Sequence, residues 1–357
     1  MKIGLVIYGF LDTLSGGYLY DRMLVDALRA QGDTVEIISL PWRNYLSHLM
    51  DNISFRLPAG LDVVIQDELN HPSLLSANRL PHSCPVISLV HHLRCSEKRP
   101  AWQNALYRVV ERRYLRAVDG FIFNSGTTRG VVHALVGGGK PNLVAYPPTD
   151  RFGDGLSAEA TESTQWICAR SLEDPPLRLL FIGNVIPRKG LHTLLNALIR
   201  LPKGSVQLDI VGSLVTDPNY AAEMQRRAGK VNPASIRFHG ALNNDPLVAM
   251  LKTSHVLVVP SSYEGFGIVY LEGMAFGLPA IGTKAGAASE IIEENKTGYL
   301  IDPGDDQALA SHLAALARDR ERLTRLSLNA WQRYRHQPKW EQTAASIRSF
   351  LKNQIGN

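Results

Sequence analysis

The sequence predicts an α/β protein with two parallel β-sheets, each covered by helices on both faces. Short apolar runs alternate with amphipathic stretches along the chain, which is typical of parallel strands joined by helices. A polar stretch over residues 149–176, rich in Gly, Ser, Thr, Asp and Pro, interrupts this alternation once. The length of 357 residues favours two domains, and 45% hydrophobic residues suffice for two cores.

The predicted strands are short buried runs that end in loops. They are IGLVIYGF, TVEIISL, DVVIQD, PVISLVHH and DGFIFNS in the first half, and RLLFIGN, VQLDIVG, IRFHG, HVLVVPS, PAIGT and GYLID in the second. Segments such as YDRMLVDALRAQG and LHTLLNALIRLP are helices expected between them. Ligands of such sheets bind beyond the carboxyl ends of the strands, so we expect two such domains to face a shared cleft.

Composition favours the cytoplasm as the cellular setting. No apolar run is long enough to span a bilayer. The start, MKIGLVIYGFL, has no small-residue cleavage site after it, so we interpret it as a buried first strand and not as a signal peptide. The three cysteines, Cys84, Cys95 and Cys168, fit no zinc spacing, and their odd number argues against a disulfide framework.

The net charge of +5 is unevenly distributed. Residues 318–357 hold nine Lys or Arg against three Asp or Glu, and we interpret this tail as a solvated helix face. In RVVERRYLRAV, Arg108, Arg112 and Arg116 recur on one helical face, which fits solvent, an anionic membrane surface or a phosphorylated ligand. No nucleic-acid-binding motif accompanies the charge, so we expect no nucleic-acid partner.

A second amphipathic stretch, PWRNYLSHLMDNISFRLP, follows the second predicted strand. Five of its apolar residues fall near one helical face: Tyr45, Leu46, Leu49, Met50 and Ile53. Such a stripe is core in most proteins, but it could also line an acceptor groove or dock on a membrane. We therefore expect a cytoplasmic protein and leave open a peripheral contact with the inner face of the membrane.

Two loops that follow predicted strands are candidate anion sites. Gly16 and Gly17 precede the first helix, where paired glycines let backbone N–H groups approach an anion, although a packing role explains them equally well. They match neither the dinucleotide nor the P-loop pattern. In FIGNVIPRKGLHTLL, Arg188 and Lys189 lie between a strand end and a helix start, which suits a diphosphate; an exposed basic turn is the alternative.

The stretch SSYEGFGIVYLEGMAFG places two carboxylates across a helix start. Glu264 lies in the loop, and Glu272 lies within the helix, where side chains lean back toward the N-terminus. The backbone amides of Gly267, Ile268 and Val269 suit phosphate. One carboxylate could bind the diol of a ribose, or the pair could be the acid and base of glycoside cleavage. The spacing alone leaves both open, and either Glu alone could complement the helix dipole.

These motifs resemble those of the family-4 glycosyltransferases, which have the GT-B fold. The E-x7-E pattern in PSSYEGFGIVYLEGMAFG is the most specific, and GLPAIGTKAGAASEII, NKTGYLIDPGD and GNVIPRKGLHTLL fit as well. SGGYLYDRML resembles the family's glycine loop, and VHHL and FNSGTTR fall where members carry a His and a Ser facing the cleft. WQRYRHQPKWEQTAASIRSFL resembles its final helices, which return to the first domain. The resemblance covers nearly the whole chain.

The resemblance implies a domain plan. We expect an acceptor-side Rossmann-like domain over residues 1–165 and a nucleotide-sugar-binding Rossmann-like domain over residues 166–337. A C-terminal helix over residues 338–357 would return to the first domain.

The resemblance also implies an activity and its residues. Members move a hexose from a nucleoside-diphosphate sugar, UDP- or GDP-linked, to an acceptor, with retention of configuration and without a metal or a cofactor. By position, Glu264, His91 and Lys189 would be catalytic, and Glu272 would hold the ribose. The implied donor-binding residues are Gly16, Gly17, Arg188, Lys189, Gly265, Phe266, Gly267, Ile268, Val269 and Glu272. The acceptor would be a sugar, a glycolipid or a small molecule.

One departure from the family pattern matters. Members carry Arg directly after the first glycine of the diphosphate loop, where this chain has Asn184, and Arg188 could supply the missing charge. Two alternatives therefore stay open. One is a nucleotide-sugar hydrolase or epimerase on the same fold, and the other is a binding protein without turnover.

Overall fold

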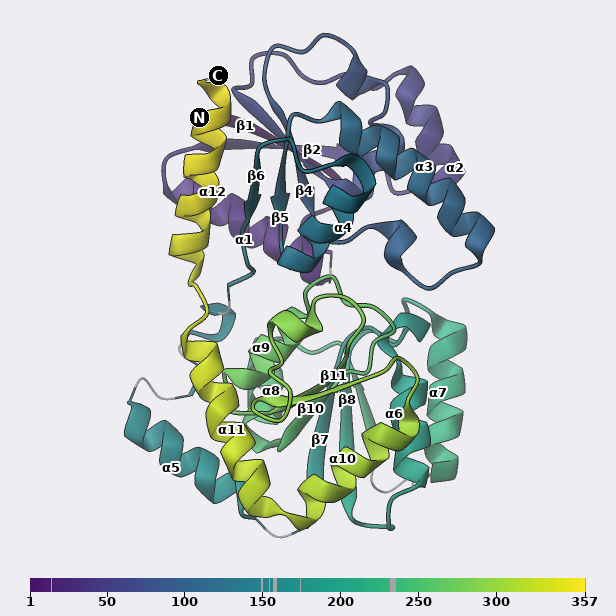
Figure 1. Ribbon diagram of the computed structural model, residues 1–357, viewed down its shortest axis with the longest axis vertical. Coiled ribbons are helices and arrows are strands. Elements are labelled where there is room, and N and C mark those ends of the chain that lie inside the picture. Colours follow the sequence, from purple (N-terminus) through teal and green to yellow (C-terminus); the bar gives the residue numbers. More distant parts are fainter. Residues whose placement is uncertain are drawn as a thin grey trace. The chain divides into compact units, whose positions relative to one another are not determined.

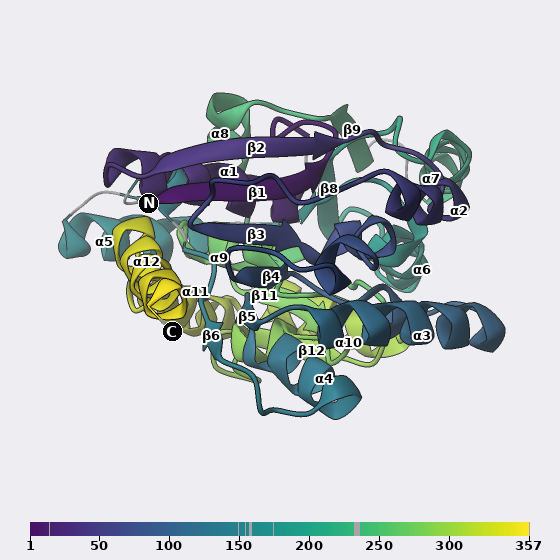
Figure 2. The same cartoon turned by 90° about the horizontal axis from the view of Figure 1, so that it is seen from above.

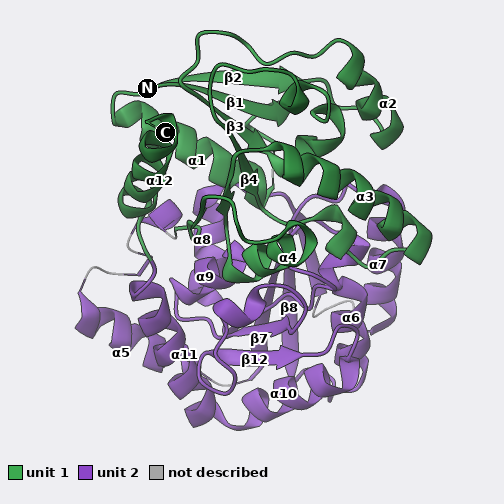
Figure 3. Ribbon diagram, turned by 45° about the horizontal axis from the view of Figure 1, so that its top comes forward, with its two compact units in different colours: residues 1–148, 338–357 green, residues 149–337 purple. Residues whose placement is uncertain are grey.

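The computed structural model describes residues 1–13, 15–148, 150–153, 155–156, 159–173, 175–231 and 236–356. The chain divides into two compact units: unit 1, Met1–Pro148 with Pro338–Asn357, and unit 2, Thr149–Gln337 (Figure 3). Over the described residues, each unit contains one six-stranded sheet in which all paired strands are parallel. The predicted fold class is confirmed.

The sheet of unit 1 has the strand order β2-β1-β3-β4-β5-β6, which Figure 2 shows from one edge to the other. The strands are β1 (Lys2–Tyr8), β2 (Thr34–Leu40), β3 (Val63–Asp67), β4 (Val86–Val90), β5 (Gly120–Phe123) and β6 (Asn142–Val144). The order reverses between β1 and β3, and in open α/β sheets this is where ligands bind, beyond the carboxyl ends. β6 is not among the strands predicted from the sequence, because three residues are too few to show a strand pattern.

Alternating side chains build a core on each face of this sheet. Ile3 and Leu5 point to one face, and Val6 and Tyr8 point to the other. The first face packs against α1 and α12, and the second against α3 and α4. The helices of unit 1 are α1 (Gly16–Ala30), α2 (Tyr45–Met50), α3 (Ala101–Ala117), α4 (Gly126–Val136) and α12 (Trp340–Ile355), with the short 3-10 helices η1 (Asp51–Ile53), η2 (Glu68–Ser73), η3 (Ala77–Arg79) and η4 (Arg94–Ser96).

The sheet of unit 2 has the order β12-β11-β10-β7-β8-β9, and Figure 1 labels β7, β8, β10 and β11 of it. Its strands are β7 (Leu177–Ile182), β8 (Val206–Val211), β9 (Ile236–Gly240), β10 (Val256–Val258), β11 (Ala280–Thr283) and β12 (Gly298–Ile301). The order reverses between β7 and β10, so the loops after these two strands flank the expected ligand site of this unit.

Helices pack around the sheet of unit 2. They are α5 (Ala160–Ser171), α6 (Leu191–Ile199), α7 (Pro218–Val231), α8 (Asn244–Thr253), α9 (Ile268–Met274), α10 (Asp306–Arg318) and α11 (Arg320–Arg335), with η5 (Asp150–Phe152), η6 (Pro187–Lys189) and η7 (Ala288–Glu290). All of these α-helices except α5, which packs against α11, contribute to one continuous apolar core. Among the described residues, no helix is both long enough and apolar enough to cross a bilayer.

The boundaries of the two units differ from the expected domain boundary at residue 165. Helix α5 packs against α11, and both lie within unit 2, so the structure groups the segment that follows Pro148 with the second sheet. The C-terminal helix α12 packs against α1 within unit 1, where Ile347 and Leu351 join the core.

Candidate active site

Two loops meet at the strand-order reversal of unit 2. The first follows β7 and carries Arg188 and Lys189, and the second follows β10 and carries Glu264. The backbone N–H of Ser262 donates a 2.8 Å hydrogen bond to the carbonyl oxygen of Arg188. Gly190 has φ +71°, and a Cβ there would lie 2.0 Å from the carbonyl oxygen of Pro260, so only glycine allows this approach.

Lys189 and Glu264 form a close ion pair between these loops. The Nζ of Lys189 lies 2.5 Å from Oε1 of Glu264, and the Oγ of Ser261 donates a 2.6 Å hydrogen bond to the same oxygen. Burial alone would raise the pKa of Glu264, but Lys189 and Arg188 beside it bring that pKa down to about 2. Glu264 is therefore a buried carboxylate that stays ionised across the physiological pH range.

Arg188 adds a second cation to the same place. Its Nη1 donates a 3.1 Å hydrogen bond to the carbonyl oxygen of Tyr263, directly before Glu264. The guanidinium is thus held by the loop that carries the carboxylate. Two adjacent cations of this kind can bind a diphosphate.

Helix α9 begins directly after this loop. Gly267 precedes its first residue with φ +92°, and a Cβ there would lie 2.6 Å from the ring of Tyr270. Phe266 is buried, while Ile268 and Val269 form the first turn, where backbone N–H groups point out of a helix. The residues Gly265 to Val269, expected from the sequence, therefore lie at one helix start beside the Lys189–Glu264 pair.

Glu272 lies within α9 and is 3% exposed. Its Oε1 accepts a 2.8 Å hydrogen bond from Nη1 of Arg151, whose Nη2 donates to Oδ1 of Asn244 at 2.9 Å. The guanidinium of Arg151 also lies over the ring of Phe152, 4.8 Å from its centroid. Arg151 could not be predicted as a site residue, because it falls in the polar stretch over residues 149–176, which has no strand or helix pattern.

Asn184, at the position of the missing arginine, has a structural partner. Its Oδ1 accepts a 3.3 Å hydrogen bond from the backbone N–H of Ser213, which follows β8. Gly212 comes so close to Gly183 that a Cβ on it would lie 2.0 Å from the carbonyl oxygen of Gly183. Asn184 thus ties the loop after β7 to the loop after β8.

In unit 1, the carboxyl end of β4 and helix α1 bring a histidine to an aspartate. The Nε2 of His91 lies 3.0 Å from Oδ1 of Asp21, which is fully buried and whose Oδ2 has no hydrogen-bond partner among the described residues. A Cβ on Gly17 would lie 3.2 Å from Cδ2 of His91, so Gly17 lets α1 pack against the imidazole. Gly16 is the first residue of α1, which Ser15 caps.

Burial and charge set the protonation of this group. Burial alone would lower the pKa of His91, but Asp21 and Asp67 raise it to about 9. Burial and the charge of Asp21 raise the pKa of Asp67 to about 7. His91 is therefore an imidazolium at neutral pH, held by a buried carboxylate.

Two sets of side chains in the described part of the chain could hold a metal ion by their spacing. One is Asp21, Asp67 and His91, and the other is Glu68, His71 and Glu111; within each set the ligand atoms lie within 4.8 Å of one another. A protonated His91 would have to lose its proton to bind a metal.

The second set is buried and already engaged. Burial lowers the pKa of His71 to about 4, so this imidazole is neutral, and its Nε2 lies 3.0 Å from the hydroxyl of Tyr45. Glu111 accepts a hydrogen bond from the backbone N–H of Arg94 at 2.6 Å. These contacts give both residues a structural role without an ion.

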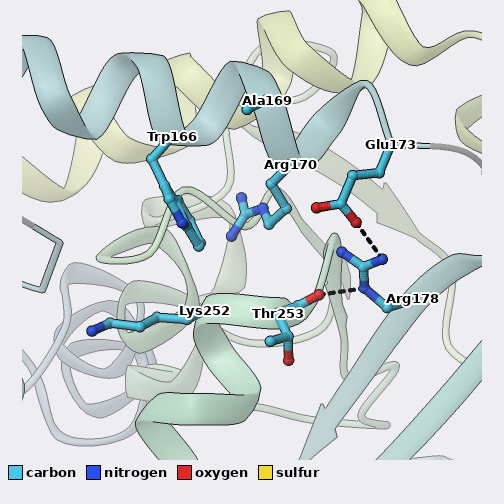
Figure 4. Close-up of a pocket in the computed structure, with 7 residues that line it drawn as sticks. All are labelled: Trp166, Ala169, Arg170, Glu173, Arg178, Lys252 and Thr253. Atoms are coloured by element: carbon cyan, nitrogen blue, oxygen red, sulfur yellow. Dashed lines mark hydrogen bonds and ion pairs between the residues drawn. The ribbon is translucent and has the colours of Figure 1, made fainter.

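A pocket of about 480 Å³ lies elsewhere on unit 2 (Figure 4). Arg178, at the amino end of β7, lines it and contacts Glu173 at 2.6 Å, so the pocket is at the opposite end of β7 from the Lys189 loop. The full lining is Trp166, Ala169, Arg170, Glu173, Arg178, Lys252 and Thr253. None of the site residues expected from the sequence lines it.

Comparison with known proteins gives a family match for unit 2. Residues 165–333 match the protein family described as "Glycosyl transferases group 1". The GDP-mannose-dependent alpha-(1-6)-phosphatidylinositol monomannoside mannosyltransferase of Mycobacterium tuberculosis is 30% identical over 258 residues, which are 69% of this chain and 64% of that protein. The glycogen synthase of the same organism is 27% identical over 282 residues, 77% of this chain and 64% of that protein. The match thus spans less than two thirds of either relative's length.

Solved structures share the fold over nearly the whole chain. A sucrose-phosphate synthase from Thermosynechococcus elongatus has a TM-score of 0.81 at 21% identity and covers 99% of both chains. The Anabaena protein HepE in complex with UDP-glucose has a TM-score of 0.75 at 17% identity, over 99% of this chain and 100% of that one. The chain has the GT-B fold of these proteins.

Proposed function

We propose that the protein is a glycosyltransferase that moves a hexose from a UDP- or GDP-linked sugar to an acceptor, with retention of configuration and without a metal. The observation that carries the proposal is the Lys189–Glu264 ion pair at the strand-order reversal of unit 2, beside the start of α9. The group 1 glycosyltransferase match over residues 165–333 and the GT-B fold support the same class.

In the proposal, unit 2 binds the donor. The diphosphate is bound by Lys189, Arg188 and the first backbone amides of α9. The donor is also contacted by Gly265, Phe266 and Gly267. Glu272 accepts hydrogen bonds from the ribose hydroxyls, and Arg151 orients its carboxylate.

The chemistry follows from the charges. As the bond between sugar and phosphate breaks, the nucleoside diphosphate gains negative charge, which Lys189 and Arg188 stabilise. One well-aimed donor of this kind contributes roughly 3 kcal/mol to lowering a barrier. The sugar becomes positively charged, and Glu264, which stays ionised because of its low pKa, stabilises that charge. The leaving phosphate takes the proton of the acceptor on the same face of the sugar.

Unit 1 contributes His91, Gly16 and Gly17 in this proposal. The imidazolium of His91 donates a hydrogen bond to the donor sugar, and Asp21 keeps it protonated. Gly16 and Gly17 leave the start of α1 open to an anion. No step of the reaction needs a metal ion or a cofactor.

The acceptor is proposed to be a sugar or a glycolipid met in the cytoplasm. A relative's name supports the glycolipid, because that protein is a phosphatidylinositol monomannoside mannosyltransferase. Peripheral contact with a membrane at unit 1 would bring such an acceptor to the enzyme. Nucleic acid has no part in the proposal.

A panel of nucleotide sugars tests the donor site by thermal shift. Donor at a hundred times its dissociation constant stabilises the folded protein by about 2.7 kcal/mol. We expect one UDP- or GDP-sugar to raise the melting temperature of the wild type and to lose most of this effect with Lys189→Ala. The proposal fails if no nucleotide sugar shifts either protein.

A further inference from the structure

Unit 1 exposes large apolar side chains on the short helix α2 and the 3-10 turn that follows it. Leu46, Met50 and Ile53 are 70%, 61% and 70% exposed. Their spacing of four and three residues places them on one helical face. The sequence left open whether this stripe is core or a surface, and for these three residues the core interpretation is wrong. Trp42, just before α2, is also exposed.

The neighbouring helix α3 repeats the same arrangement. Trp102, Leu106 and Val109 are exposed and have the same spacing of four and three residues. The two helices touch through their inner faces, since the rings of Tyr45 and Tyr107 pack edge to face with centroids 4.8 Å apart. Figure 1 shows α2 and α3 together at one side of unit 1. Two neighbouring helices therefore each expose an apolar stripe.

The exposed charged side chains of α3 are all positive. All four arginines of α3 are exposed: Arg108, Arg112, Arg113 and Arg116. The one acid of α3, Glu111, is buried and accepts a hydrogen bond from a backbone N–H group. The one acid of α2 and η1, Asp51, is paired with Arg43 at 3.0 Å. Together, α2, η1 and α3 expose apolar groups, and α3 adds exposed cations.

We propose that α2, η1 and α3 form a docking surface for an anionic lipid bilayer, here called the α2–α3 surface. Exposed Leu, Met, Ile and Trp side chains on amphipathic helices enter the boundary between headgroups and acyl chains. Arginines beside them bind the negative headgroups, and each adds to the attraction. The helices lie in the plane of the membrane and do not cross it.

Charge favours a bilayer over a protein as the occupant. A second copy of this chain would present the same cationic α3, and like charges facing each other oppose association. An anionic membrane offers both an apolar interior and a negative surface, which match the two kinds of exposed group on α2 and α3.

The proposed function gives the α2–α3 surface its purpose, because a transferase that acts on a glycolipid must reach the membrane. Only this purpose rests on the proposed function. The evidence for the surface comes from unit 1 alone, and the surface can be tested without donor or acceptor. A protein that binds vesicles but transfers no sugar would refute the proposed function and leave the surface standing. A protein that transfers sugar but does not bind vesicles would refute the α2–α3 surface and leave the proposed function standing.

Co-sedimentation of the full chain with vesicles tests the surface. The probes are phosphatidylcholine vesicles with about 30% phosphatidylglycerol and vesicles of phosphatidylcholine alone, at about 0.1 M and about 0.5 M salt. We expect at least about tenfold tighter binding to the anionic vesicles at low salt, with most of the difference lost at high salt.

Two variants separate the apolar and cationic parts. Leu46→Ser/Met50→Ser should weaken anionic binding about tenfold, and so should Arg108→Glu/Arg112→Glu. The matched controls change exposed residues of unit 2: Ile199→Ser/Val215→Ser for the apolar pair and Arg226→Glu/Arg237→Glu for the charges. Unchanged melting temperatures confirm that all four variants are folded.

Three results would overturn the proposal. The first is equal binding to neutral and anionic vesicles, or no binding to either. The second is equal weakening by the control variants, which would mean that net charge alone drives binding. The third is a stable dimer in solution that Leu46→Ser/Met50→Ser dissociates, which would assign the α2–α3 surface to a second copy of the chain.

Discussion

Glu264 is the residue at which the proposed chemistry can be separated from donor binding. Its carboxylate is ionised because Lys189 and Arg188 hold its pKa near 2 despite burial. Glu264→Gln keeps the shape and removes the negative charge, so we expect kcat to fall roughly a hundredfold while the dissociation constant of the nucleotide sugar changes little. Steady-state kinetics with calorimetry checks this, and a kcat within a few-fold of wild type would contradict the assignment.

Glu272 should contribute to the affinity for the donor and not to the rate of transfer. Removing a carboxylate that accepts hydrogen bonds from two ribose hydroxyls costs roughly 1.5–3 kcal/mol of binding free energy. Glu272→Ala should therefore raise the dissociation constant of the nucleoside diphosphate about tenfold to a hundredfold. Arg151→Met, which leaves the carboxylate in place without its 2.8 Å partner, should raise it by a smaller factor. Calorimetry with UDP and GDP measures the dissociation constants of both variants. An unchanged affinity of Glu272→Ala would contradict the assignment of Glu272 to the ribose.

Asp21 should control the charge of His91. The raised pKa of His91, about 9, comes from carboxylates that oppose the effect of burial. Asp21→Asn removes the nearest of these, so the pKa should fall toward or below the ordinary value of about 6.5. NMR titration of the His91 ring protons measures the midpoint. A midpoint that stays near 9 in the variant would show that Asp67 or Glu68, and not Asp21, sets the charge.

The sequence could predict only some of these residues. Lys189, Glu264 and Glu272 were predicted because each falls in a motif beside a strand end or helix start. Arg151 and Asp21 were not, because their roles depend on contacts between segments distant in the chain. Arg151 meets a partner 121 positions away and Asp21 one 70 positions away, and no local pattern encodes such distances.

At the scale of elements, one glycine fixes the approach of the two site loops. Gly190 has φ +71°, and a Cβ there would collide with the carbonyl oxygen of Pro260 at 2.0 Å. Gly204 has a similar φ of +77° but open space around it. Gly190→Ala should therefore destabilise the protein by roughly 1–3 kcal/mol more than Gly204→Ala, since only the first adds a clash to the backbone strain.

Urea unfolding of the two glycine variants measures the difference. Equal losses in the two would mean that the loops can move apart without cost, and that their close contact does not depend on Gly190.

Element type was predictable where burial imposes a pattern. All the strands except the three-residue β6 were found from the sequence, because helices cover the sheets and make most strands short apolar runs. The exposure of Leu46, Met50 and Ile53 could not be predicted, because an apolar stripe on a helix has the same sequence whether it meets a core or solvent.

At the scale of the whole molecule, the two units should respond oppositely to pH. In unit 1, burial raises the pKa of Asp67, Glu68 and Glu111 to about 7, and carboxylates raise that of His91 to about 9. These groups bind protons more tightly when folded. Their contribution to the free energy of unfolding of unit 1 is therefore fully present below their unfolded pKa values. It is lost as pH rises through about 7 and then about 9. His71, buried and neutral, opposes this trend only on the acid side.

Unit 2 should lose stability in acid. Glu264 has a pKa lowered to about 2, and burial lowers the pKa of His255 to about 3. Both groups bind protons less tightly in the folded protein, so their contribution to stability is lost as pH falls. The loss begins at the ordinary pKa of each group, about 6.5 for His255 and about 4.5 for Glu264.

The cysteines report the two units separately. Cys84 and Cys95 lie in unit 1 and Cys168 lies in unit 2, so thiol labelling during urea unfolding gives a midpoint for each unit. Between about pH 5 and about pH 9, we expect the unit 1 midpoint to fall and the unit 2 midpoint to hold or rise. Midpoints that move together would mean that these buried groups do not govern the pH dependence of each unit.

The release of UDP or GDP from nucleotide sugars, measured with and without acceptor, tests whether the protein is an acceptor-dependent glycosyltransferase. The assay uses the full chain, the donor that raises its melting temperature, and sugars and glycolipids as acceptors, in the presence of EDTA. We predict release that requires an acceptor, persists in EDTA and falls roughly a hundredfold with Glu264→Gln. Release at the same rate without any acceptor would identify a hydrolase, and the absence of release under every condition would contradict a transferase.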